Sequence, residues 1–194
     1  MTGLQESWKR AEAHLLRAHE SAGLPVVADF HDYLDNNELE LAADVLADFG
    51  DDRDGLPQAF WEALAYAYEN MELGHKAKRR RFRMYEAEHG FVEARLRLTA
   101  TEDGGRSHPI FTDYRPDWNI GNRTHSGELE LNGAPITLED ALSIPPGGTG
   151  LVRLHPLWRE GWTEVQTGAE IAMHEGSRVV GNAVVLRVKL PRQR

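Results

Sequence analysis

The spacing of apolar residues changes near residue 90, and this change most strongly constrains how the chain can fold. Before it, apolar side chains recur every three or four residues, as in residues 8–18, which places them on one side of a helix. After it, residues 92–98 alternate strictly between apolar and charged side chains, the period of a half-buried strand. The chain is therefore predicted to be α+β, with a small helical bundle over residues 1–88 and an antiparallel β-barrel over residues 91–194.

Short local motifs predict where several elements begin and end. Asn37 starts a sequence with the spacing of a capping box, and Gly50 is placed to end the helix that follows. In the second half, the pair Asn132-Gly133 is typical of a tight turn between two hairpin strands. The same pattern analysis predicts strands at residues 128–131, 151–154, 163–165 and 179–190.

Charge is distributed unevenly along the chain. The net charge of −9 divides into −8 for residues 1–90 and −1 for residues 91–194. An acidic body does not attract nucleic acid through its long-range field, so RNA binding would need a local basic patch. The segment KAKRRRFR at residues 76–83 has six basic residues in eight and ends the helical domain. It is either a phosphate-binding stripe or a solvated segment neutralised by the acidic helices before it.

Two motifs in the second half resemble the C-terminal barrel domain, the third domain, of elongation factor Tu. These are EDGGRSHPIF at 102–111, followed by YRP at 114–116, and the later run GAEIAMHEGSRVVG at 168–181. The resemblance covers about residues 91–190 and implies a compact antiparallel barrel. It also implies an RNA-facing surface that includes Arg106, His108 and Arg178. No G-x-x-x-x-G-K-[ST] phosphate loop occurs in the sequence, so we expect neither nucleotide binding nor GTPase activity.

The first half weakly resembles small helical immunity proteins of bacterial toxin systems, through the stretch FHDYLDNNELELAADVLADFG at residues 30–50. Such a module implies a protein partner. Its acidic residues would suit a basic surface on that partner, or they would form an ordinary solvated face. The candidate protein-binding residues are Asp29, Asp32, Asp35 and Glu38.

Residue patterns that would indicate catalysis or a fixed metal are scarce. The sequence has no cysteine, no H-E-x-x-H pair and no G-x-S-x-G elbow. No run approaches the roughly 18 apolar residues of a membrane-spanning helix. The N-terminal residues MTGLQESWKR lack the apolar core of a signal peptide. We therefore expect a cytoplasmic protein that is not an enzyme, has no cofactor or metal and does not contact membranes.

These observations favour a non-catalytic binding protein in which the acidic helices bind a protein and the barrel resembles a translation-factor domain. The alternative is an RNA-binding or tRNA-binding accessory factor of translation. Its candidate residues are basic or, in one case, histidine, and they are Lys76, Arg79, Arg80, Arg81, Arg106, His108 and Arg178.

Overall fold

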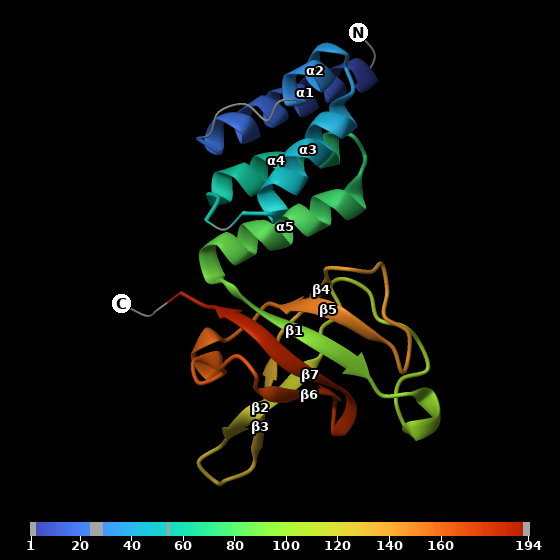
Figure 1. Ribbon diagram of the computed structural model, residues 1–194, viewed down its shortest axis with the longest axis vertical. Helices are drawn as coiled ribbons and strands as arrows, with labels where there is room; N and C mark the ends of the chain where they lie inside the picture. The colour runs from blue at the N-terminus through green and yellow to red at the C-terminus, as the bar shows by residue number, and fades with distance from the viewer. Residues whose placement is uncertain (1–2, 24–28, 54, 192–194) are drawn as a thin grey trace. The chain divides into compact units, whose positions relative to one another are not determined.

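The change of periodicity near residue 90 coincides with a change from helices to strands in the computed structural model (Figure 1). The structure describes residues 3–23, 29–53 and 55–191. The chain divides into two units, residues 1–88 and residues 89–194. Within the described residues, five α-helices precede seven antiparallel strands, which confirms the α+β expectation.

The first unit is built from α1 (Gly3–Ser21), α2 (Phe30–Asp35), α3 (Leu39–Asp51), α4 (Gln58–Asn70) and α5 (Gly74–His89), whose last residue belongs to the second unit. Helices α1 and α4 pack along one another, and α3 packs against both. The helical spacing seen in the sequence explains this core, because each helix turns one apolar side inward. Its largest fully buried side chains are Leu15, Phe30, Leu46, Phe60, Leu64 and Tyr68.

Two of the predicted helix ends are wrong. Asn37 does not cap α3; it has a φ of +58°, and Glu38 is the residue before the helix. An asparagine tolerates this left-handed conformation better than most residues. Gly50 lies inside α3, where an added Cβ would collide with the ring of Trp61. The glycine therefore permits close packing of α3 on α4 instead of ending the helix.

The second unit is a single curled sheet, a half-barrel, with strand order β3-β2-β6-β7-β1-β5-β4. Its strands are β1 (Phe91–Leu98), β2 (Asp117–Arg123), β3 (Leu129–Gly133), β4 (Ile136–Leu138), β5 (Thr149–Leu154), β6 (Glu170–Glu175) and β7 (Arg178–Lys189). This architecture is compatible with the barrel domain expected from the sequence.

Strand β1 lies between β7 and β5 and follows the predicted alternation. Its apolar residues from Val92 to Leu98 face the core, whereas Arg95 and Arg97 are exposed on the opposite face. The core of this unit is filled by apolar residues from every strand except β3, and it includes two indoles that are fully buried, Trp118 and Trp162. Gly90 precedes β1 with a φ of +76°, and an added Cβ there would collide with the Lys189 carbonyl.

Two predictions for this unit are wrong. Asn132-Gly133 is not a hairpin turn, because β3 continues through Gly133 and the next strand, β4, lies at the opposite edge of the sheet. Residues 163–165 do not form a strand; they follow a short 3-10 helix, Arg159–Trp162. Burial of Trp162 in the core holds this segment in place.

Candidate binding surfaces

The four predicted protein-binding carboxylates gather around the short helix α2. Asp29 immediately precedes this helix, and Asp32 and Asp35 follow at intervals of three residues, so the three lie on one side of it. Glu38 lies just beyond the helix, before α3. All four residues are exposed, and we refer to them as the acidic surface.

An aromatic contact between Phe30 and α1 helps to hold helix α2, which carries the acidic surface. Phe30 is completely buried, and its ring stacks on His19 of α1 with 4.8 Å between ring centroids. His31 meets His19 edge-on at 5.1 Å. Burial, and then the neighbouring His31, lower the pKa of His19. Neutral His19 is therefore favoured while α2 is docked.

The acidic surface differs from Asp44 and Asp51, two other carboxylates of its unit, in lacking cationic partners. Within the part of the chain that the structure describes, none of its four carboxylates lies within 4.0 Å of a lysine or arginine nitrogen. By contrast, Asp44 accepts a 2.7 Å bond from Lys76, and Asp51 accepts a 2.8 Å bond from Arg83. An unpaired exposed charge keeps its full field available for a partner.

The basic segment at residues 76–83 is part of α5, and at least five of its six basic side chains pair with carboxylates of their own unit. Lys76 bonds both Asp44 and Glu40, while Arg81 bonds Glu69 at 2.6 and 2.9 Å. Although burial opposes the charge of Lys76, its two carboxylate partners raise its pKa. The hydrogen bonds that Arg81 donates to Glu69 raise the pKa of Arg81.

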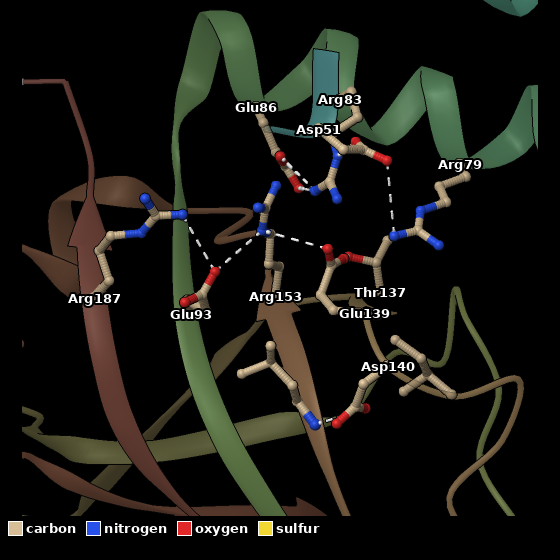
Figure 2. Close-up of polar contacts among 12 residues, drawn as sticks. Asp51, Arg79, Arg83, Glu86, Glu93, Thr137, Glu139, Asp140, Arg153 and Arg187 are labelled. Atoms are coloured by element: carbon tan, nitrogen blue, oxygen red, sulfur yellow. Dashed lines mark hydrogen bonds and ion pairs between the residues drawn. The ribbon is translucent and has the colours of Figure 1, made fainter. Parts of the chain in front are cut away.

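A second group of ion pairs between α3 and α5 is centred on Asp51 (Figure 2). Its carboxylate receives Arg80 at 3.0 Å and Arg83 at 2.8 Å, and Arg79 lies 3.9 Å away. Arg83 also bonds Glu86 at 2.9 Å. Burial alone would raise the pKa of Asp51, but Arg80 and Arg83 hold it below its ordinary value. Three of the four predicted RNA-binding residues of α5 (Lys76, Arg80 and Arg81) thus have carboxylate partners at 3.0 Å or less.

In the second unit, the structure brings two of the predicted RNA-binding residues to one carboxylate. Glu175 of β6 pairs with Arg106, and Arg178 of β7 bonds its second oxygen at 3.0 Å. The hydroxyl of Tyr114 also donates to Glu175, and the Arg106 guanidinium lies 4.4 Å from the centre of the Tyr114 ring. We call these four residues the Glu175 cluster. His108 is exposed, and its Nδ1 lies 2.8 Å from the Ser107 hydroxyl.

Other charged residues with a defined place in the fold were not singled out in the sequence. Figure 2 shows Arg153 between the carboxylates of Glu93 and Glu139, with nitrogen-to-oxygen distances of 3.4 and 3.7 Å. Arg187 bonds Glu93 at 3.2 Å. These are cross-strand pairs, since residue 93 is in register with residue 153 on one side and residue 187 on the other. Strand alternation marks such positions as outward-facing but does not identify their partners.

Arg95 and Arg97 were also not among the candidate binding residues, although the alternation of residues 92–98 already indicated that they face outward. Both were placed on the exposed face of β1 by alternation alone. In the described part of the chain, neither guanidinium lies within 4.0 Å of a carboxylate. They are thus less neutralised than Arg106 or Arg178.

The structure contains no grouping that would indicate bound metal, within the residues it describes: no three histidine, aspartate or glutamate side chains are close enough together to hold an ion. Among the same residues, no helix is both long and apolar enough to cross a bilayer. A comparison of the chain with models of known protein families finds no match. The function of the candidate sites must therefore be inferred from their geometry and charge.

Proposed function

We propose that this chain is a non-catalytic binding protein whose acidic helical unit docks a protein with a basic surface. The observation that supports this most directly is the difference between two sets of carboxylates in the helical unit. Asp44 and Asp51 form ion pairs with basic side chains of α5, whereas the acidic surface has no cationic partner among the described residues. Charge that the fold does not use for its own stability is available for steering and orienting a partner.

The immunity-protein resemblance of residues 30–50 fits this proposal, because the acidic surface lies on and beside that stretch. A small helical module that covers a basic surface acts by occlusion and needs no catalytic group. For the barrel, the proposal follows its resemblance to the third domain of elongation factor Tu. The half-barrel would present a translation-factor-like surface to a protein partner.

The test is recovery of binding proteins from the cell lysate on the tagged full-length chain, with and without nuclease. Three chains are compared: the wild type, the variant Asp32→Lys/Asp35→Lys/Glu38→Lys, and a control variant with the same charge change in the second unit, Glu102→Lys/Asp103→Lys/Glu164→Lys. The three control carboxylates are exposed and have no ion pair in the described structure. The two variants thus differ in position but not in net charge.

We expect a protein with a basic face that survives nuclease treatment, binds the wild type and the control variant, and is lost from the acidic-surface variant. With that protein purified, reversal of the acidic surface should slow association by about tenfold or more at low salt, because steering is electrostatic. Equal recovery on all three chains would contradict the proposed role of the acidic surface.

A second candidate function, RNA or tRNA binding, is favoured by one observation. Arg106 and Arg178 converge on Glu175, whose carboxylate occupies the position between two guanidinium groups that a phosphate would suit. If the cluster binds phosphate, Glu175 competes with the ligand. Glu175→Gln should then strengthen binding of bulk tRNA several-fold, and Arg178→Gln should weaken it.

Fluorescence anisotropy with labelled bulk tRNA over a range of salt concentrations measures this. Each phosphate contact contributes about −0.7 to −0.9 to the slope of log affinity against log salt. Arg178→Gln should therefore flatten the slope by about one contact. Arg123→Gln, at an exposed arginine whose side chain donates to the Gly127 carbonyl, is the control. If Glu175→Gln leaves the affinity unchanged, the Glu175 cluster is not a phosphate site.

A further inference from the structure

An apolar groove lies next to the acidic surface of the helical unit. It is formed where the N-terminal half of α1, the start of α3 and the turn between α4 and α5 come together, and its volume is about 400 Å³. A second hollow of about 320 Å³ adjoins it, and both are lined by Trp8 and Asn37. We call the first hollow the Trp8 groove, and its apolar lining consists of Trp8, Leu39, Leu41, Met71 and Leu73.

Trp8 occupies an unusual place on its helix. It belongs to the same apolar stripe as Ala11, Leu15 and Ala18, all of which are completely buried, yet 42% of Trp8 remains exposed. Across the groove, Leu41 is 46% exposed, although α3 buries its other side in the core. A large indole and a leucine that are both exposed in the lining of one hollow are characteristic of an interaction site. Neither contributes its full apolar area to the stability of the unit.

The rim of the two hollows is acidic. Glu38 borders the Trp8 groove and also belongs to the acidic surface, so the two features are continuous. Glu12 borders the adjoining hollow, together with Lys9. Within the described residues, neither Glu12 nor Glu38 pairs with a lysine or arginine, whereas the third rim carboxylate, Glu40, bonds Lys76 at 2.8 Å. An apolar centre with an unpaired acidic rim suits an apolar side chain between basic neighbours.

We infer that the Trp8 groove is the anchoring pocket for the partner of the acidic surface, and that it takes one bulky apolar side chain from a segment in which lysine or arginine flanks that side chain. This inference rests on the proposed function and adds the chemistry of the contacting segment. The acidic surface orients the partner through charge. The groove supplies the apolar contact, which in most interfaces accounts for most of the binding energy.

The inference is tested with two short amidated peptides in which two lysines precede and two follow a central residue. That residue is phenylalanine in one peptide and serine in the other. Each is titrated into the isotopically labelled full chain while the indole N–H resonance of Trp8, assigned with the variant Trp8→Phe, is followed. The phenylalanine peptide should shift this resonance and bind roughly tenfold more tightly than the serine peptide, the effect of burying one apolar side chain.

Leu41→Ser removes an exposed lining residue and should abolish the preference for phenylalanine. Leu16→Ser provides the matched control, because Leu16 is 39% exposed and does not line the groove. Circular dichroism of both variants checks that the helices are retained. Raised salt should weaken binding of both peptides, because both carry the same positive charges.

The outcomes separate this inference from the proposed function. If both peptides bind equally, and Asp32→Lys/Asp35→Lys/Glu38→Lys abolishes both, the acidic surface binds basic segments but the groove is not an anchor. If the phenylalanine peptide binds the groove with no salt dependence, the basic character of the segment is wrong. If neither peptide moves the Trp8 resonance, the inference fails, while the lysate experiment still decides the proposed function.

Discussion

The helical unit has two acidic regions with similar composition and different surroundings. Around Asp44 and Asp51, carboxylates of α3 meet basic side chains of α5 at 2.7 to 3.0 Å. Around α2, the acidic surface faces solvent without such partners in the described structure. The comparison teaches that negative charge has two separable uses in one small unit: the first region stabilises the fold, and the second is available for a partner.

The largest effect is expected from removing the centre of the paired region. Asp51→Asn removes the carboxylate to which both Arg80 and Arg83 donate. Breaking one side of a largely buried ion-pair network should lower the free energy of unfolding by about 2–4 kcal/mol. Urea unfolding followed by circular dichroism at the helix band measures it. Glu6→Gln, which breaks an exposed pair with Arg10, should cost no more than about 0.5 kcal/mol. Equal losses in the two variants would show that the Asp51 network is not stabilising.

Acid should selectively weaken the same paired region. Because Arg80 and Arg83 lower the pKa of Asp51, its contribution to stability is present above its ordinary value of 3.8 and is lost as the pH falls through the lowered pKa. Wild type should therefore lose more unfolding free energy than Asp51→Asn as the pH is taken below 3.8. Parallel curves for the two proteins would argue that Asp51 titrates alike in the folded and unfolded states.

A smaller pH effect is expected at the base of the acidic surface. Burial and His31 lower the pKa of His19, so the folded unit binds this proton less readily than the unfolded chain does. The stability that neutral His19 provides is complete above 6.5 and declines as the pH falls through the lowered pKa.

His19→Phe keeps an aromatic ring against Phe30 but does not titrate. The loss of unfolding free energy between about pH 7 and about pH 5 should therefore be smaller in this variant than in the wild type. Some loss should persist, since burial also lowers the pKa of His14. His125→Gln, at an exposed histidine of the other unit, should behave as the wild type does. An unchanged pH dependence in His19→Phe would show that protonation of His19 does not cause this loss of unfolding free energy.

The smallest effect on stability is expected at the acidic surface. Asp32→Lys/Asp35→Lys/Glu38→Lys should change the unfolding free energy by no more than about 0.5 kcal/mol per site, because these exposed side chains have no partner to lose in the described structure. Together with the Asp51→Asn result, this would complete the contrast between the two acidic regions. A loss as large as that of Asp51→Asn would mean that the acidic surface serves folding.

Much of the secondary structure could be predicted because it depends on local periodicity. The buried stripe of α1 and the alternation of β1 both follow from spacing that neighbouring residues share. Predictions based on single residues were less successful, since tertiary packing overrode local preference. Gly50 accommodates the Trp61 ring inside α3, and Asn132-Gly133 continues a strand instead of turning.

For the candidate sites, the sequence by itself determined the charges of the chain and the outward direction of Arg95 and Arg97. Only the tertiary structure decided which charges neutralise one another. Lys76 and Glu40 are 36 residues apart in the chain, and Arg106 and Glu175 are brought together from distant segments. The same holds for the Trp8 groove, which three segments form together. Coulomb energy and apolar contact depend on distance in space, and the helical and strand periods specify only neighbours along the chain.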